Sequence, residues 1–217
     1  MITDERTSTY IDSLSGGNTT FLDELEKSCI KDNIPIIRRS MQSMLKFILA
    51  SYKPKRILEV GAAVGFSAIL MAQYSDSDAH ITTIEKYEKR IPLAKENFKK
   101  SGFEDKITFI ADDATIVLKR LNEENRKFDL IFMDAAKGQY MNFYEDVMNL
   151  MDKGSILVSD NVLQDGDIIQ SRFAVTRRNR TIHSRMREYL KTLTEDDRLT
   201  TTVLPVGDGL TLSVRRG

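Results

Sequence analysis

The chain has 217 residues, of which 41% are hydrophobic and 29% charged, and this is enough for one α/β domain with a complete core. Lys plus Arg and Asp plus Glu both number 32, so the net charge indicates no acidic partner. The single cysteine, Cys29, excludes an internal disulfide bond and is typical of a reducing compartment. The sequence shows neither a signal pattern nor an apolar run of membrane-spanning length, so we expect a cytoplasmic protein without a membrane anchor.

The first part of the chain is expected to be helical. Apolar residues recur at helical spacing across residues 21–33 and again across 41–49, and Pro35 separates the two stretches. The sequence contains no repeat, low-complexity segment or long linker that would mark a second domain. We therefore expect residues 1–217 to form a single domain, with a helical segment, residues 1–52, packed on it.

From Arg56 onward, predicted strands and helices alternate. The expected strands span residues 57–60, 81–84, 107–110, 130–133 and 156–159, and the expected helices span residues 66–74, 87–100, 115–121 and 140–151. This alternation predicts a parallel, doubly wound α/β sheet. After Asp160, a polar loop leads into an arginine-rich helix, and two further runs, 199–206 and 210–215, flank a Gly-Asp-Gly turn. That ending predicts a β-hairpin at the edge of the sheet.

The turn after the first predicted strand has the composition of a ligand-binding loop. Gly61 permits the turn, and Gly65 would let a ligand approach the backbone closely. The Gly-x-x-x-Gly spacing matches neither the Gly-x-Gly-x-x-Gly dinucleotide motif nor a phosphate-binding P-loop. Such a turn alone is as often purely structural, so the interpretation depends on the strands that follow.

Acidic residues end the next two predicted strands. Glu85 lies twenty positions after Gly65 and could accept hydrogen bonds from both hydroxyls of a ribose. Asp112, Asp113 and Ala114 lie where an adenine edge could bind. A nucleoside site without phosphate-binding residues indicates S-adenosylmethionine, a nucleoside that carries a sulfonium and no phosphates.

Oxygen-bearing side chains also end the two later strands. Asp134 follows the run 128–133, and Asp160 and Asn161 follow the run 155–159. The carboxyl ends of parallel strands line one crevice, so these side chains would meet there. Three oxygen ligands suit a hard cation such as Mg²⁺. The alternative is that each aspartate is an ordinary turn residue at a strand end.

Several segments together resemble the cation-dependent O-methyltransferases, a family that includes the catechol and caffeoyl-CoA enzymes. The likeness rests on residues 57–67, Glu85, Met133-Asp134-Ala135-Ala136-Lys137 and Ser159-Asp160-Asn161-Val162. The resemblance implies the Rossmann-like class I methyltransferase fold, a seven-stranded doubly wound sheet whose last strand is antiparallel. It also implies a homodimer, because the family often forms dimers.

The same resemblance implies roles for individual residues. S-adenosylmethionine would be held by Ile37 (or Ile36), Gly61, Ser67, Glu85, Asp113, Ala114 and Asp134. Mg²⁺ or Mn²⁺ would be held by Asp134, Asp160 and Asn161. Asp134 and Lys137 are the implied catalytic residues, since Lys137 falls where the catechol enzyme has its proposed catalytic lysine.

These residues would support an in-line transfer of a methyl group from a sulfonium to an oxygen. The cation would lower the pKa of a substrate hydroxyl and orient it, while Lys137 could take the proton. Alternatively, Lys137 is a solvated lysine at a helix start. The catechol enzyme has aromatic residues in its glycine loop and after its first metal aspartate. Here these positions are Ala62-Ala63-Val64 and Ala135-Ala136, which speaks against a simple catechol substrate.

An arginine-rich segment follows the predicted metal site. It holds six arginines and no acidic residue: Arg172, Arg177, Arg178, Arg180, Arg185 and Arg187. A helical projection places Arg180, His183 and Arg187 on one face, opposite an apolar stripe that includes Met186 and Tyr189. A basic cluster beside an active site suits a phosphate backbone, although such a cluster is often just a solvated face.

The segment 178–187 also resembles the bacterial branch of this family that methylates tRNA at the wobble position. That branch converts 5-hydroxyuridine to 5-methoxyuridine, and the vicinal 5-hydroxyl and 4-oxygen can chelate Mg²⁺ as a catechol does. We therefore predict a tRNA 5-hydroxyuridine O-methyltransferase that binds the anticodon loop. The nucleic-acid-binding residues would be Arg177, Arg178, Arg180, Arg185 and Arg187.

Two alternatives remain open. The first is a small-molecule O-methyltransferase for catechols or CoA-linked phenols, in which the arginines could grip a CoA phosphate. The second is a non-catalytic nucleic-acid-binding module, which would have no need of the Asp134, Asp160 and Asn161 constellation.

Overall fold

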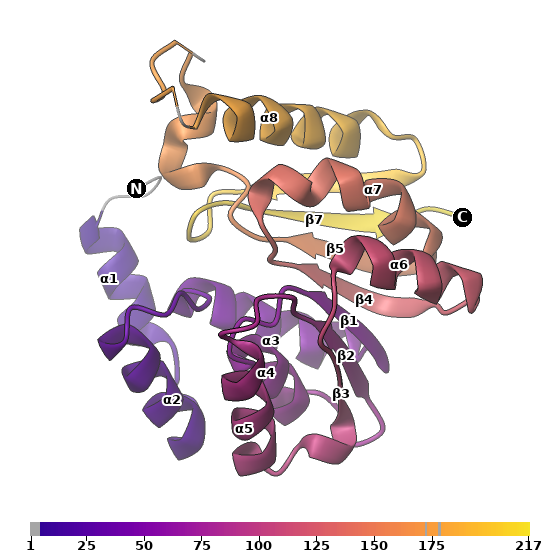
Figure 1. The fold of residues 1–217 in the computed structure, drawn as a ribbon. Coiled ribbons are helices and arrows are strands. Elements are labelled where there is room, and N and C mark those ends of the chain that lie inside the picture. The colour runs from indigo at the N-terminus through magenta and orange to yellow at the C-terminus, as the bar shows by residue number, and fades with distance from the viewer. Residues whose placement is uncertain (1–4, 172, 178) are drawn as a thin grey trace.

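The protein is described by a computed structural model that covers residues 5–171, 173–177 and 179–217. Its centre is a seven-stranded sheet with the order β3-β2-β1-β4-β5-β7-β6 (Figure 1). The strands are β1 (Arg56–Val60), β2 (His80–Ile84), β3 (Ile107–Ile110), β4 (Phe128–Met133), β5 (Met151–Ser159), β6 (Leu199–Leu204) and β7 (Leu210–Arg215). Strands β1 to β5 pair in parallel, whereas β7 is antiparallel to both β5 and β6. The predicted class I methyltransferase sheet is confirmed.

Helices cover both faces of this sheet, and the two faces hold separate parts of the core. The helices are α1 (Glu5–Leu14), α2 (Thr20–Lys31), α3 (Arg39–Tyr52), α4 (Phe66–Tyr74), α5 (Ile91–Ser101), α6 (Ala114–Glu123), α7 (Tyr140–Asn149) and α8 (Arg180–Glu195). Figure 1 shows α6, α7 and α8 on one side of the sheet and the N-terminal helices with α4 and α5 on the other. Along β1, Leu58 and Val60 pack into the first core and Ile57 into the second, as the two-residue period of a strand requires.

The N-terminal helices are anchored through a buried glutamine. The Gln42 Nε2 atom donates to Glu26 Oε1 and to the Ile37 backbone carbonyl, both at 3.1 Å, and Asn18 Nδ2 donates to Gln42 Oε1 at 2.7 Å. Sequence analysis anticipated α2 and α3 but did not single out α1. Its apolar side chains Tyr10, Ile11 and Leu14 are largely exposed, so α1 lacks the buried stripe that marks a helix in sequence.

The helix expected at residues 87–100 begins later, at Ile91. Glu85 accepts hydrogen bonds from the amides of Lys86 and Tyr87, which holds the chain in a turn before the helix can start. Pro92 then occupies the first helical turn, where its missing N–H costs nothing. In the described residues, no helix has the length and apolarity that a membrane span requires.

Candidate active site

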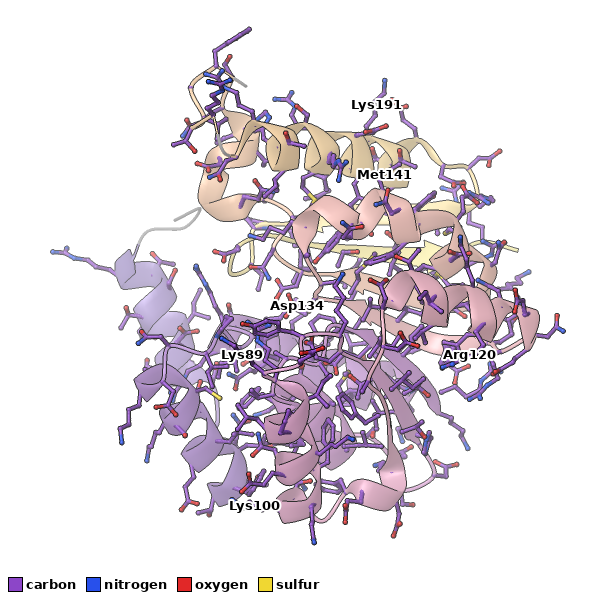
Figure 2. The ribbon with its side chains drawn as sticks, in the orientation of Figure 1. Lys89, Lys100, Arg120, Asp134, Met141 and Lys191 are labelled. Carbon is purple, nitrogen blue, oxygen red and sulfur yellow. The ribbon has the colours of Figure 1, made fainter. Side chains whose placement is uncertain are left out.

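A cavity of about 720 Å³ opens at the carboxyl ends of the central strands. Figure 2 shows Asp134 in the middle of the molecule, between the helices of the two faces. The cavity walls come from the segment before α3, the turns after β1, β2, β3, β4 and β5, and the hairpin turn between β6 and β7. Among the lining residues are Ile37, Gly61, Glu85, Asp113, Ala114, Asp134, Lys137, Asp160 and Asn161. The structure thus brings into one cavity most of the cofactor, metal and catalytic residues that the sequence suggested.

Gly61 allows the ends of β1 and β4 to lie close together. Its φ of 107° is strained for any residue with a side chain, and a Cβ atom there would lie 2.2 Å from the Asp134 carbonyl oxygen. Gly65, by contrast, does not line the cavity. A Cβ atom at Gly65 would lie 2.5 Å from the Phe98 ring, so this glycine serves the packing of α5 rather than the approach of a ligand.

The Glu85 carboxylate organises the wall of the cavity between β1 and β2. Its Oε2 accepts the amide of Ala63 at 2.8 Å, and its Oε1 accepts the amides of Lys86 at 2.9 Å and Tyr87 at 2.8 Å. Oε2 keeps acceptor capacity after its single bond, because each carboxylate oxygen has two lone-pair sites. A fixed acceptor of this kind can take hydrogen bonds from ribose hydroxyls.

Asp113 has a structural task that the sequence did not indicate. It caps α6, because its Oδ1 accepts the amide of Thr115 at 2.8 Å. Its Oδ2 lies 3.0 Å from Lys86 Nζ, and that hydrogen bond lowers the pKa of the Asp113 carboxyl. The residue therefore stays ionised at the wall of the cavity.

The predicted metal ligands lie together. Asn161 donates from its Nδ2 to Asp134 Oδ1 at 3.2 Å and from its backbone amide to Asp160 Oδ1 at 2.7 Å. The φ of Asn161 is 61°, a left-handed conformation that asparagine adopts more readily than most residues. This conformation brings its carboxamide back to the Asp134 carboxylate.

Burial raises the pKa of both the Asp134 and the Asp160 carboxyls, and Asp134 raises that of Asp160 further, while Lys137 opposes both shifts. Lys137 and Arg90 only partly offset the burial of Asp134, so the two buried carboxylates favour a bound cation. Two carboxylates and one carboxamide are the oxygen donors that Mg²⁺ or Mn²⁺ prefers, so the residues fit such an ion. The described residues contain no group of three or more His, Cys, Asp or Glu side chains placed to hold a metal ion, and the third donor at this site is an amide.

Tyr140 is the site residue that sequence analysis missed. Its hydroxyl lies 3.1 Å from the Met133 carbonyl oxygen and 3.0 Å from the Asp160 carbonyl oxygen, and the side chain is fully buried. Its ring meets the edge of Tyr189, whose hydroxyl lies 2.7 Å from Ser159 Oγ. The ends of β4 and β5 are thereby fixed relative to each other.

The segment before α3 closes one side of the cavity. Ile37 and Arg38 line it, and Arg38 forms an ion pair with Asp208 at 2.7 Å. Asp208 belongs to the hairpin turn between β6 and β7, which also lines the cavity. The segment before α3 and the turn between β6 and β7 therefore meet beside the site.

Ser67 lies away from the cavity, inside α4. Its hydroxyl and that of Thr83 hydrogen-bond to Glu59, which is completely buried in β1. Burial raises the pKa of Glu59 to about 7, and the two hydroxyls only partly oppose that shift. In this structure, Ser67 contacts strand β1 beneath the turn that follows it.

The described arginines of the basic segment lie outside the cavity lining, but one adjoins it. Arg185 donates to the Gly138 carbonyl oxygen at 2.8 Å, and Gly138 stands between two lining residues, Lys137 and Gln139. Arg177 is exposed, whereas Arg172 and Arg178 lie outside the described residues. The prediction that His183 shares the basic face is wrong: it is buried, and its Nε2 lies 3.1 Å from the Gln170 carbonyl oxygen.

The fold and the cavity at its strand ends define a class I methyltransferase. The chain belongs to the O-methyltransferase family, whose model matches residues 12–216. It is 33% identical to the tapetum-specific methyltransferase 1 of Arabidopsis thaliana over 183 residues, 84% of this chain and 77% of the relative. It is also 32% identical to the caffeoyl-CoA O-methyltransferase of Stellaria longipes over 178 residues, 79% of this chain and 73% of that enzyme.

Solved structures agree with this assignment. A methyltransferase of Podospora anserina bound to S-adenosylhomocysteine (SAH) superposes with a TM-score of 0.88 at 30% identity. The match covers 98% of this chain and 95% of the fungal chain.

Proposed function

We propose that this protein is a divalent-cation-dependent O-methyltransferase that moves the methyl group of S-adenosylmethionine to one of two neighbouring oxygens on its substrate. The observation that carries the proposal is one cavity that holds both a nucleoside-type acceptor, Glu85, and the oxygen cluster of Asp134, Asp160 and Asn161. The Podospora relative bound to SAH, the demethylated product of this cofactor, supports the cofactor assignment.

The chain's own groups would hold the cofactor in the part of the cavity between β1, β2 and β3. Glu85 accepts hydrogen bonds from the ribose, because its carboxylate is already fixed by three backbone amides. Gly61 leaves room for the cofactor beside the β1 turn, Asp113 and Ala114 meet the base, and Ile37 covers it.

In the part of the cavity at the ends of β4 and β5, Mg²⁺ or Mn²⁺ would be held by Asp134, Asp160 and Asn161. A bound cation would lower the pKa of a coordinated substrate hydroxyl and would fix the orientation of two neighbouring substrate oxygens. Lys137, on the same wall, would take the hydroxyl proton on its Nζ in its neutral amine form, which a cation bound beside it favours. S-adenosylmethionine, when bound, would supply the methyl group to the deprotonated oxygen, and its sulfonium would become a neutral thioether.

The comparisons favour a small phenol as the substrate. A relative that is 32% identical to this chain over 178 residues is a caffeoyl-CoA O-methyltransferase. In this chain Ala63, Ala135 and Ala136 line the cavity, and their short side chains leave space for a substrate larger than a catechol ring. A CoA-linked phenol fits both observations.

A second substrate class, tRNA carrying 5-hydroxyuridine, is favoured by the basic segment. Its described arginines Arg180, Arg185 and Arg187 donate to backbone carbonyls and form no ion pair with a described carboxylate. Arg185 connects this positive surface to the cavity edge at Gly138. Such a surface suits a phosphate backbone, and a wobble base can be splayed into a pocket.

One assay separates the two substrates. The purified protein is incubated with S-adenosylmethionine, Mg²⁺ and either caffeoyl-CoA or tRNA that carries 5-hydroxyuridine, and products are identified by mass spectrometry. A methylated phenol with unchanged tRNA supports the first class, and 5-methoxyuridine supports the second. If neither acceptor is methylated while the protein binds SAH, the proposed vicinal-oxygen chemistry is wrong.

A further inference from the structure

An aromatic side chain stands almost fully exposed beside the basic segment. Phe173 is 84% exposed, in the stretch that connects the 3-10 helix Gln164–Ile169 to α8. The guanidinium carbon of Arg180 lies 5.9 Å from the centre of its ring. This exposure leaves one face of the ring accessible to a flat ligand, and the neighbouring guanidinium can add a cation–π contact.

Arg180, beside this ring, and Arg187, on the same face of α8, keep their charge while being held by backbone carbonyls. Arg180 donates to the Val175 carbonyl oxygen at 3.4 Å, and Arg187 donates to the Ile168 carbonyl oxygen at 3.4 Å. Carbonyl oxygens orient a guanidinium without neutralising it. Elsewhere Arg39 and Arg198 pair with carboxylates at 3.0 and 2.6 Å. The surface around Phe173 therefore attracts anions more strongly than those paired arginines do.

Helix α8 connects this surface to the edge of the cavity. Arg180 and Arg185 lie five positions apart on α8, a rise of about 7.5 Å along the helix axis. Arg185 in turn contacts Gly138, which lies between two residues that line the cavity. A single strand that crosses the first turns of α8 could therefore reach both the Phe173 ring and the cavity edge at Gly138.

We propose that Phe173 and Arg180 form a stacking platform for one unpaired base of a single-stranded RNA, next to the nucleotide that enters the cavity. An exposed ring with adjacent unpaired guanidiniums is the combination by which proteins bind single-stranded nucleic acid. Bases in a duplex are stacked on each other and cannot reach the ring, so the platform selects unpaired RNA. This inference rests on the tRNA candidate of the proposed function.

The test uses the full chain and fluorescence anisotropy with a labelled single-stranded RNA and the matching RNA duplex. Phe173→Leu keeps an apolar side chain but removes the aromatic face. We expect it to bind the single strand roughly 5- to 150-fold more weakly, the range for loss of one stacked base, with an unchanged salt slope. Phe173→Tyr should restore binding. Ile169→Ala is the matched control, because Ile169 is 81% exposed nearby but has no ring.

Several results would overturn the platform. One is a Phe173→Leu variant that binds the single strand as tightly as the wild type. A second is an Ile169→Ala variant that loses as much RNA affinity as Phe173→Leu. A third is binding to anionic lipid vesicles that depends on both Phe173 and Ile169. Each of these two results would indicate a general apolar surface. The tRNA candidate is judged separately by 5-methoxyuridine formation with the wild-type protein. If 5-methoxyuridine forms and Phe173→Leu binds the single strand as tightly as the wild type, only the stacking platform is excluded. If RNA binding depends on Phe173 but no 5-methoxyuridine forms, only the proposed tRNA methylation is excluded.

Discussion

The Tyr140 hydroxyl lies 3.0 Å from the backbone carbonyl oxygen of Asp160. The same hydroxyl lies 3.1 Å from the carbonyl oxygen of Met133, the residue before Asp134. One buried side chain thus connects the two strand ends that carry the candidate cation ligands. Their separation is set by this contact and by the parallel pairing of β4 with β5.

Replacing Tyr140 by phenylalanine should loosen this geometry without leaving a cavity. We expect Mn²⁺ affinity, measured by calorimetry, to fall by about 10- to 100-fold, as is typical when a partner that orients metal ligands is lost. Tyr144→Phe is the control, because the Tyr144 hydroxyl hydrogen-bonds to Asp196, which does not line the cavity. Equal Mn²⁺ affinity in both variants would show that Tyr140 does not position the ligands.

Removal of the Glu85 carboxylate should weaken cofactor binding. Glu85→Ala loses the acceptor for the ribose hydroxyls, at a cost of roughly 1.5–3 kcal/mol for each charged hydrogen bond. Titration calorimetry with SAH measures this loss. Because Glu85 also fixes three backbone amides, Glu85→Gln serves as the variant of nearly equal size, and it should show an intermediate affinity. An affinity that is unchanged in Glu85→Ala would remove this residue from the site.

The buried Glu59 should make stability depend on pH. Its pKa is raised from 4.5 to about 7 in the folded protein, so the folded state retains a proton that the unfolded chain has released. Stability from this group is present below about pH 4.5 and is lost as the pH rises through about 7. We expect the free energy of unfolding to fall by up to about 3 kcal/mol over this interval, and Glu59→Gln to lack this part of the decrease. The free energy of unfolding of the wild type and of Glu59→Gln is measured by urea unfolding at several pH values in one buffer series. If the two proteins show the same dependence on pH, Glu59 is not the cause of the decrease.

Neutralising Arg180, Arg185 and Arg187 together to glutamine should weaken tRNA binding. Each lost phosphate contact should reduce the slope of log affinity against log salt by about 0.7 to 0.9. The affinity for SAH should stay unchanged, because none of these three arginines lines the cavity. Arg120→Gln, which removes an exposed arginine of α6, is the control. A wild-type salt slope in the triple variant would exclude these arginines from the tRNA interface.

Much of the fold could be predicted because its signals are local. Alternating strands and helices gave the parallel sheet, and the Gly-Asp-Gly turn gave the terminal hairpin. The acidic strand ends, such as Glu85 and Asp160, could be anticipated because parallel strands bring their carboxyl ends to one edge of the sheet.

Other features depend on contacts that no local pattern records. Tyr140 looks like an ordinary helix-start residue until the carbonyls of β4 and β5 are placed beside it. The Arg38–Asp208 ion pair joins the segment before α3 to the turn between β6 and β7, which are far apart in the sequence. His183 was assigned to the solvent face because a helical projection ignores the segment 164–170, which covers this part of α8 and supplies the Gln170 carbonyl.

The most direct test of cation-dependent methyl transfer is an assay with S-adenosylmethionine and each acceptor in excess EDTA, followed by addition of Mg²⁺. We predict that transfer is abolished by EDTA and restored by the cation. Asp160→Ala and Asn161→Ala should remain inactive with Mg²⁺ while still binding SAH, since neither is assigned to the nucleoside. Full methyl transfer in excess EDTA would contradict the assignment of Asp134, Asp160 and Asn161 to a catalytic cation.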